Sequence, residues 1–336
     1  MSKTSTIEAD KKTVSLDALY SLIQHDLKRV DALILERVKN EVPLIGDVAR
    51  HIIISGGKRI RPALTLISAQ LCHYEGHRHI ALAAAIEFIH TATLLHDDVV
   101  DESTLRRGLA TANEVFGNKA SVLVGDFLLG QAFQLMASDG SQAALKILSD
   151  AAAVISKGEV MQLMTEGQPE TTIENYLQVI SSKTAVLFAA ACELGATIAG
   201  KGRHEDALRE FGIYIGIAFQ LVDDALDYAA DSKTMGKNTG DDFQEGKITL
   251  PVILAYNAGS REERVFWIRT LGELQQTPND FEEALLFMRK YGAIEQTIAM
   301  AERYCHKARL CLSDFNNSKA KSAMLDIVDF CIHRAY

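Results

Sequence analysis

The sequence predicts an all-α protein that forms one large helical bundle. Apolar residues recur at helical spacing along almost the whole chain, as in Leu16, Leu19 and Ile23 near its start. Only 5 prolines occur among the 336 residues, so long helices can run without interruption. Alternating strand-like patterns are scarce, and no change in composition marks a linker. We therefore expect a flexible, polar N-terminal lead-in over residues 1–12, followed by a single all-α domain over 13–336.

Glycine and proline interrupt the helical pattern at a few points and divide it into segments. The first break is the loop 55–57, which contains two glycines. A second loop covers 165–169, after which Thr171 and Glu174 have the spacing of a capping box that begins the next helix. The last long loop is 236–246, and helical pattern resumes after it.

Composition and charge exclude several classes of partner and compartment. The net charge of −9 argues against a general nucleic-acid-binding protein. The 5 cysteines are dispersed without a C-x-x-C pair, which is typical of reduced thiols in a cytoplasmic protein. No uncharged apolar run reaches 18 residues, which argues against a membrane-spanning helix. We expect a cytoplasmic protein that does not bind nucleic acid.

Two short acidic clusters of the form D-D-x-x-D carry the most information about function. They begin at Asp97 and Asp223, 126 residues apart, and both lie within helical apolar pattern. Residues four apart share a helix face, so the first and last aspartates of each cluster repel one another. A bound cation would offset that repulsion, and oxygen ligands without a nearby cysteine favour Mg2+, which also binds substrate phosphates. The predicted metal ligands are Asp97, Asp98, Asp101, Asp223 and Asp227.

Small groups of basic residues lie at separate points in the sequence. Lys58 and Arg61 follow a glycine pair and can donate charge-assisted hydrogen bonds to a diphosphate. Arg106 and Arg107 follow the first acidic cluster, where they can hold phosphate oxygens. The alternatives are a solvated basic helix start for the first pair and salt bridges to nearby acidic residues for the second.

Other polar residues lie near the acidic clusters but are weak evidence when taken singly. His90 precedes Asp97 by seven residues, about two helical turns, and so lies on nearly the same face. Lys183 and Thr184 open an apolar helix, and Gln220 stands about one turn before the second acidic cluster. A structural histidine and a plain helix start are the alternatives here.

The loop 236–246 supplies Lys237 and is followed directly by Lys247. Such a loop can close over bound phosphate and exclude water, and the alternative is a mobile surface loop. Two acidic clusters imply several metal ions on one diphosphate, and the separate basic groups imply a second diphosphate. Two diphosphates beside an apolar cavity indicate an enzyme that joins apolar diphosphates.

At these residues the chain resembles the trans-isoprenyl diphosphate synthase family, in particular its polyprenyl branch. The matching stretches follow the family's order and span most of the chain: GGKRIRP (56–62), EFIHTATLLHDDVVDESTLRRG (87–108), Lys183-Thr184, FQLVDDALDY (219–228) and GKNTGDDFQEGKITLP (236–251). One D-D-x-x-D cluster also occurs in terpene cyclases, whereas the complete ordered set is specific. The resemblance implies an all-α homodimer with a deep central cavity in each subunit, and Mg2+ as cofactor, with three ions per active site.

The resemblance also implies roles for individual residues. The residues expected to bind the allylic diphosphate are Arg106, Lys183, Thr184, Gln220, Lys237 and Lys247. The residues expected to bind isopentenyl diphosphate are Lys58, Arg61, His90 and Arg107. Lys183, Thr184 and Gln220 would act near the allylic carbocation and are the predicted catalytic residues.

Product length is predicted from the residues just before the first acidic cluster. Ala92 and Thr93 stand five and four positions before Asp97, where short-chain family members often carry an aromatic side chain that blocks the product's tail. Small residues leave that channel open, so we expect a product of about C40 to C50, with octaprenyl favoured and farnesyl diphosphate as primer. A shorter farnesyl or geranylgeranyl product is the alternative. The candidates for the channel floor, on the following helix, are Phe127, Phe133 and Met136.

Products of this kind usually become quinone tails, and a greasy product makes transient membrane contact during release plausible. Three other functions compete with this interpretation. A class I terpene cyclase needs no second diphosphate site, so Lys58, Arg61 and Arg107 argue against it. A non-catalytic subunit of a heteromeric synthase typically lacks aspartates from one cluster, whereas all six are present. The His96-Asp97 pair suggests a metal phosphohydrolase, but no further histidine pair has ligand spacing.

Overall fold

The computed structural model of the chain describes residues 15–39, 41–54, 57–106, 108–229 and 240–334. Within these residues the chain is helical apart from one two-stranded hairpin, which confirms the predicted all-α class. The elements in chain order are α1 (Asp17–Val38), α2 (Pro43–Ile54), α3 (Ile60–Leu71), α4 (Arg78–Val100), β1 (Leu105–Arg106), β2 (Leu109–Ala110), α5 (Ala112–Phe116), α6 (Asn118–Asp139), α7 (Gln142–Thr165), α8 (Ile173–Ile180), η1 (Ser181–Ala185), α9 (Val186–Ile198), α10 (Gly202–Asp227), α11 (Asp241–Gln244), α12 (Leu250–Ala258), α13 (Arg261–Trp267), η3 (Ile268–Gly272), α14 (Asp280–Tyr291), α15 (Ala293–Cys311) and α16 (Lys319–His333).

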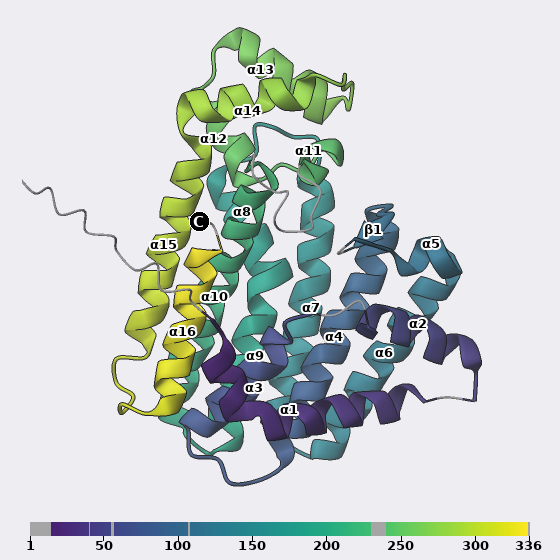
Figure 1. Cartoon of the computed structure of the whole chain (residues 1–336), viewed down its shortest axis with the longest axis vertical. Helices are drawn as coiled ribbons and strands as arrows, with labels where there is room; N and C mark the ends of the chain where they lie inside the picture. The colour runs from purple at the N-terminus through teal and green to yellow at the C-terminus, as the bar shows by residue number, and fades with distance from the viewer. Residues whose placement is uncertain (1–14, 40, 55–56, 107, 230–239, 335–336) are drawn as a thin grey trace, which may run out of the picture.

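Long helices packed side by side form the body of the molecule (Figure 1). α4 packs against α3 and α6, and α10 packs against α9 and α15. α1 runs across the ends of these helices and contributes Leu19 and Ile34 to the core. Because α4 and α10 carry the two acidic clusters, the apolar packing of the bundle fixes where those clusters lie.

A smaller apolar cluster lies at the end of the molecule formed by α12, α13 and α14, at the top of Figure 1. Trp267 and Met288 are fully buried at its centre. Ile248 and Leu254 pack against both this cluster and the main core. The two apolar clusters are therefore linked by shared side chains.

The start of α8 differs by one residue from the sequence prediction. Thr172 caps the helix, because its hydroxyl accepts a hydrogen bond from the backbone N–H of Asn175 at 3.1 Å. The Thr171 hydroxyl instead donates to the carbonyl of Gln168 at 2.7 Å. Glu174 remains in the first turn, where a negative charge favours the positive end of the helix dipole.

In the described part of the chain, three helical stretches are long and apolar enough to span a membrane by length and composition alone. In α4 and in Ile173–Ile198, 72 % of the apolar window is buried inside the protein, so the core accounts for their composition. α6 differs, because only 44 % of its window is buried. Leu123 and Phe133 on this helix are 67 % and 44 % exposed, which leaves α6 with an uncovered apolar face.

Candidate active site

A cleft of about 830 Å³ opens among the helices that carry the two acidic clusters. Both clusters lie in the last turn of their helix, since α4 ends at Val100 and α10 at Asp227. A helix C-terminus already carries partial negative charge, so carboxylates there make the region more attractive to cations. Many of the predicted site residues line this cleft: Lys58, Arg61, His90, Thr93, Asp97, Asp101, Arg106, Lys183, Thr184, Gln220, Asp223, Asp227 and Lys247.

Lysines from other elements pair with the first acidic cluster. Lys183 Nζ lies 3.6 Å from Asp97 Oδ2, and Lys247 Nζ lies 2.9 Å from Asp101 Oδ2. Burial raises the pKa of Asp97, and the positive charge of Lys183 opposes that shift. Burial acts to lower the pKa of Lys247, but the carboxylates of Asp101, Asp242 and Glu245 together outweigh it and the pKa is raised. The cluster is therefore charge-paired by side chains that could also bind phosphate.

Asp98 differs from the other aspartates of the first cluster. Its side chain is 1 % exposed and is not among the residues that line the cleft. Arg106 donates to Asp98 Oδ1 from Nε at 2.8 Å and from Nη2 at 2.6 Å. Adjacent residues on an α-helix point about 100° apart, which turns Asp98 away from the cleft that Asp97 faces. The prediction that Asp98 is a metal ligand therefore finds no support in this geometry, and its contacts fit a residue that holds Arg106.

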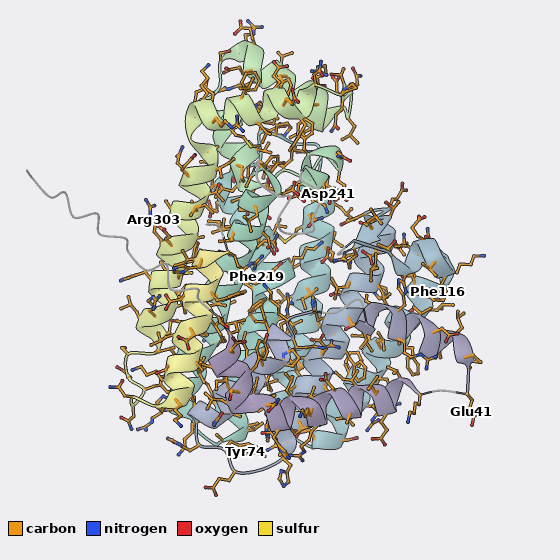
Figure 2. All side chains as sticks on the ribbon, in the orientation of Figure 1. Glu41, Tyr74, Phe116, Phe219, Asp241 and Arg303 are labelled. Atoms are coloured by element: carbon orange, nitrogen blue, oxygen red, sulfur yellow. The ribbon has the colours of Figure 1, made fainter. Side chains whose placement is uncertain are left out.

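The second acidic cluster contacts the end of the chain and the loop after α10. Arg334 Nη2 donates to Asp223 Oδ1, and the Arg334 guanidinium lies 4.1 Å from the centre of the Phe219 ring. Phe219 lies in the middle of the bundle in Figure 2. Asp227 Oδ2 accepts a hydrogen bond from the backbone N–H of Asp242 at 3.0 Å, which ties α11 to the end of α10.

A π-helical turn, η1 (Ser181–Ala185), brings Lys183 and Thr184 to the cleft. Such turns are rare and are often found at functional sites, because they widen the helix locally. Gly158 on α7 permits the close approach, since a Cβ atom there would lie 2.7 Å from the backbone nitrogen of Lys183. A larger side chain at this position would force α7 away from the turn.

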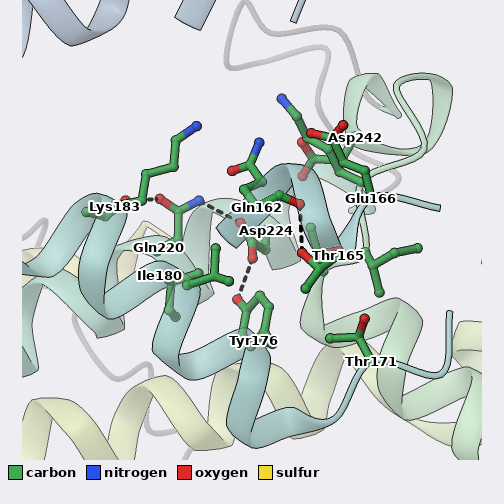
Figure 3. A pocket seen from close by; sticks show the side chains of 15 residues that line it. Gln162, Thr165, Glu166, Thr171, Tyr176, Ile180, Lys183, Gln220, Asp224 and Asp242 are labelled. Atoms are coloured by element: carbon green, nitrogen blue, oxygen red, sulfur yellow. Dashed lines mark hydrogen bonds between the residues drawn. The ribbon is translucent and has the colours of Figure 1, made fainter. Parts of the chain in front are cut away.

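Hydrogen bonds connect Thr184 to the middle aspartate of the second cluster, as Figure 3 shows. The Thr184 hydroxyl donates to Gln220 Oε1 at 3.0 Å, and Gln220 Nε2 donates to Asp224 Oδ1 at 2.7 Å. The Tyr176 hydroxyl donates to Asp224 Oδ2 at 2.5 Å. Burial, followed by the charge of nearby Asp242, raises the pKa of Asp224 to about 8. No role for Tyr176 or Asp224 was predicted from the sequence.

Glu159 on α7 is a further cleft residue that was not predicted from the sequence. Its Oε2 atom lies 2.6 Å from Lys183 Nζ, so Lys183 bridges Glu159 and Asp97. Burial, followed by the charge of Asp97, raises the pKa of Glu159 to about 7. The sequence of α7 does not single out Glu159, because the same helix also carries Asp150, and the partners of both carboxylates depend on packing.

A basic wall, defined here as Lys58, Arg61 and His90, lies apart from the acidic clusters. Arg61 Nη1 and His90 Nε2 are 3.0 Å apart, and the Arg61 guanidinium lies 4.5 Å from the centre of the Phe188 ring. Lys58 Nζ lies 4.3 Å from the centre of the Phe330 ring. Aromatic faces help to hold Lys58 and Arg61 in place, and cationic side chains that line a cleft suit an anionic ligand.

The residues predicted to control product length occupy different environments. Thr93 lines the cleft, whereas Ala92 is 1 % exposed within the core and does not line it. Met136 is buried in the main core, and Phe127 is partly buried and packs against that core. Phe133 is 44 % exposed, so in this single chain it faces outward and does not form the floor of an internal channel.

The donor chemistry of the cleft fits a hard divalent cation. Its candidate ligands are carboxylate oxygens, and no cysteine lines the cleft. Among the residues that the structure describes, no three or more His, Cys, Asp or Glu side chains are gathered closely enough to hold a metal ion. The carboxylates face cationic side chains instead. Arg107 and Lys237, two predicted phosphate-binding residues, lie outside the described part of the chain.

This fold, with two D-D-x-x-D clusters and a basic wall around one cleft, defines an all-α transferase of the isoprenoid synthase class. Residues 42–288 match the family model described as Polyprenyl synthetase. The chain therefore belongs to the polyprenyl synthetase family and is a prenyltransferase, as the sequence resemblance implied.

Similar proteins of known activity match almost the whole chain. The octaprenyl diphosphate synthase of Escherichia coli (strain K12) is 45 % identical over 322 residues, which cover 96 % of this chain and 99 % of that protein. The octaprenyl diphosphate synthase of Haemophilus influenzae is 43 % identical over 324 residues, covering 96 % and 98 %. These relatives support the synthesis of long-chain all-trans polyprenyl diphosphate by this chain.

Solved structures agree with this assignment. A decaprenyl diphosphate synthase from Rhodobacter capsulatus superimposes with a TM-score of 0.92 at 46 % identity, covering 96 % of this chain and 100 % of that one. A polyprenyl synthase from Caulobacter crescentus CB15, complexed with calcium and isoprenyl diphosphate, gives a TM-score of 0.93 at 45 % identity, covering 97 % and 100 %.

Proposed function

We propose that the enzyme uses Mg2+ to condense isopentenyl diphosphate head-to-tail onto an allylic diphosphate. One observation carries this proposal: a single cleft combines two carboxylate clusters with the separate basic wall. The carboxylates suit a metal-bound diphosphate, and the basic wall suits a second diphosphate bound without metal. A terpene cyclase needs only the first site, so the basic wall favours a chain-elongating enzyme.

The acidic clusters and the lysines beside them would hold the allylic diphosphate. Asp97, Asp101, Asp223 and Asp227 would hold Mg2+, three ions by family resemblance. When bound, the metal would supply positive charge that offsets the negative charge developing on the departing diphosphate. Lys183 and Lys247 now pair with carboxylates, and they can turn to phosphate oxygens once those carboxylates bind metal. Arg106, held by Asp98, adds a donor to the same diphosphate.

The condensation itself needs little proton chemistry from the protein. The allylic C–O bond breaks and its electron pair leaves with diphosphate. The double bond of isopentenyl diphosphate then forms the new C–C bond, and a proton leaves to the released diphosphate. Thr184 and Gln220 line the same cleft, and their oxygen atoms suit the carbocation formed between these steps.

We propose octaprenyl diphosphate as the product and farnesyl diphosphate as the primer. The two octaprenyl synthases cited above support this length. A nonaprenyl synthase of Rhodobacter capsulatus, described as geranyl-diphosphate specific, is 39 % identical over 313 residues, covering 93 % of this chain and 96 % of that protein. These sequence identities therefore support a long-chain product in general more strongly than they support one particular chain length or one particular primer.

A product-length assay tests the proposal directly. Purified protein, Mg2+, labelled isopentenyl diphosphate and farnesyl diphosphate are incubated, and the dephosphorylated products are separated by length. We expect one long polyprenol. Products of mostly C15 to C20 would support the condensation reaction and contradict the prediction of an open channel for a long product. No incorporation would instead support a cyclase or a non-catalytic subunit.

Ala92→Phe tests the channel, because a ring at this position should block the growing chain. We expect a shorter product at a similar rate of isopentenyl diphosphate use. Ala143→Phe, which adds the same ring at an exposed position on α7, is the control and should leave product length unchanged. An unchanged length from Ala92→Phe would remove this residue from the channel.

We also propose that the enzyme is a homodimer joined through the apolar face of α6. This face exposes Val122, Leu123 and Phe133, and a second copy would bury them. Leu123→Asp should shift the mass measured by light scattering from dimer to monomer. Leu310→Asp, on an equally apolar exposed site of α15, is the control. A wild-type monomer at micromolar concentration would contradict the proposal.

The setting of the reaction is proposed on the family resemblance and the sequence. We place the enzyme in the cytoplasm, with transient membrane contact as product leaves, and with quinone side chains as the use of the product. Cell fractionation and quinone analysis after depletion of the enzyme test these assignments. Exclusive recovery in the membrane fraction, or unchanged quinone tails, would contradict them.

A further inference from the structure

Tyr176 on α8 lies behind the cleft and makes one polar contact that bears on catalysis. Its side chain is 4 % exposed, and its hydroxyl donates to Asp224 Oδ2 at 2.5 Å. Tyr176 lines a second, smaller pocket of about 140 Å³ whose lining includes Asp224, Gln220 and Thr184. The last three also line the main cleft, so the two spaces share these residues. Figure 3 shows Tyr176, Asp224 and Gln220 in the smaller pocket.

Asp224 connects Tyr176 to Gln220. Its side chain is buried, with a residue exposure of 3 %, and each carboxylate oxygen has a different donor. Tyr176 occupies Oδ2, and Gln220 Nε2 occupies Oδ1 at 2.7 Å. Oδ1 keeps an acceptor lone pair whether or not the carboxyl is protonated, so it can hold the Gln220 nitrogen in either state.

The contact with Asp224 decides which way round the Gln220 amide lies. With its nitrogen turned toward Asp224, its carbonyl oxygen faces Thr184, whose hydroxyl donates to it at 3.0 Å. A flipped amide would place N–H groups against the Thr184 hydroxyl and a carbonyl against the carboxylate. The hydrogen-bond network therefore assigns the orientation that offers oxygen to the cleft.

We propose that Tyr176 is a positioning residue for the condensation, acting through Asp224 to fix the Gln220 carbonyl and the Thr184 hydroxyl. This role rests on the proposed function. A developing carbocation is stabilised by oxygen atoms held in place before the reaction and is disfavoured by N–H donors. Tyr176 supplies that order from outside the cleft, without touching the substrate.

Losing the Tyr176 hydroxyl should disturb the orientation of the Gln220 amide and the Thr184 hydroxyl more than it disturbs the fold. Asp224 Oδ2 would be left buried without its donor, which is unfavourable. The Asp224 side chain can relieve this by turning toward Gln220 Nε2, and that movement releases the fixed amide. The aromatic ring of a phenylalanine would keep the apolar packing of α8.

Tyr176→Phe is the primary variant, and Tyr228→Phe is its matched control. Tyr228 is also buried, 1 % exposed, but packs in the separate cluster around Trp267. We expect kcat to fall about tenfold to a hundredfold in Tyr176→Phe, in line with the cost of leaving a buried acceptor without its donor. The KM for isopentenyl diphosphate should stay within about twofold, because the basic wall is unaffected. Tyr228→Phe should keep the wild-type kcat.

A double-variant cycle separates positioning from a general structural role. Without the Gln220 amide, Tyr176 has nothing left to orient. In a Gln220→Ala background, Tyr176→Phe should therefore lower kcat by less than about twofold, whereas an independent structural effect would multiply. Asp224→Asn, which changes the acceptor side of the same bond, is the second variant if Tyr176→Phe folds poorly, and should show the same saturation.

Two results would overturn the role of Tyr176 alone. One is a wild-type kcat in Tyr176→Phe, and the other is an equal loss of kcat with and without Gln220. A wild-type protein that incorporates no isopentenyl diphosphate would instead overturn the proposed function, and this role with it.

Discussion

The two acidic clusters share the pattern D-D-x-x-D and a place at the end of a helix, yet their middle aspartates have different surroundings. Asp98 on α4 forms an ion pair with Arg106, whose guanidinium donates two hydrogen bonds to it. Asp224 on α10 accepts from two uncharged donors, Tyr176 and Gln220. Both side chains are buried to a similar degree, so burial does not explain the difference.

The comparison shows that one sequence pattern can serve two purposes. In the first cluster, a buried ion pair fixes an arginine that can bind phosphate. In the second, a buried carboxyl fixes a neutral amide near the site of the carbocation. The outer aspartates of both clusters line the cleft, and the proposed metal binding is therefore assigned to them.

The largest expected effect comes from the outer aspartates, where the clusters should behave alike. Asp97→Asn and Asp223→Asn should each lower kcat about a thousandfold, because each removes charge that holds the metal at the diphosphate. Asp206→Asn on α10, a side chain that is 84 % exposed, is the control and should keep full activity. A loss below tenfold in either variant would show that its cluster does not hold metal during the reaction.

The second-largest expected effect is on stability, where variants of the two middle aspartates, Asp98 and Asp224, should behave differently. Asp98→Asn should lower the unfolding free energy by about 2 kcal/mol at pH 7, because Arg106 loses its buried charged partner. Asp224 behaves in the opposite sense. Its pKa of about 8 lies above its unfolded value, so the wild type loses stability as pH rises from about 4 to 8.

Asp224→Asn removes this pH-dependent loss. We expect the unfolding free energy of the variant to exceed that of the wild type by about 5 kcal/mol near pH 9, and to show no such gain near pH 4. Urea unfolding at both pH values measures this. If the difference in unfolding free energy between the variant and the wild type does not grow from pH 4 to pH 9, the raised pKa of Asp224 is contradicted. The same variant should have lower kcat, so stability and activity move in opposite directions.

The smallest expected effect concerns Arg334, which pairs with Asp223. Arg334→Gln should tighten binding of Mg2+ with inorganic diphosphate about fivefold, because the metal no longer competes with an internal cation. Calorimetry measures the affinity without turnover. Arg309→Gln, which breaks the Arg309–Asp329 pair between α15 and α16, is the control. Weaker binding in Arg334→Gln would show that Arg334 contacts the diphosphate.

Sequence patterns predicted the fold class and much of the cleft because both depend on local periodicity. Helical spacing alone places Asp97 and Asp101 on one face, and His90 two turns before them. The same geometry turns Asp98 away, so its separation from the cleft could also have been predicted from the sequence. The metal and substrate roles of these residues stay predictions until they are measured.

The rest of the site depends on contacts between distant segments. Tyr176 reaches Asp224 across 48 residues, and Arg334 reaches Asp223 across 111. No periodicity encodes which helices become neighbours, so these pairs were missed. Glu159 was missed for the same reason, because its partner Lys183 lies on another element.

The π turn at Ser181–Ala185 holds one residue more than an α-helical turn of similar span. Deleting Ser182 would favour a regular α-helix, and α8 and α9 would keep nearly the same facing because the wider turn had absorbed the extra residue. Tyr176 would then still face Asp224, whereas the local widening at Lys183 and Thr184 would be lost. Such a shortened chain would keep its fold and lose the geometry of its cleft.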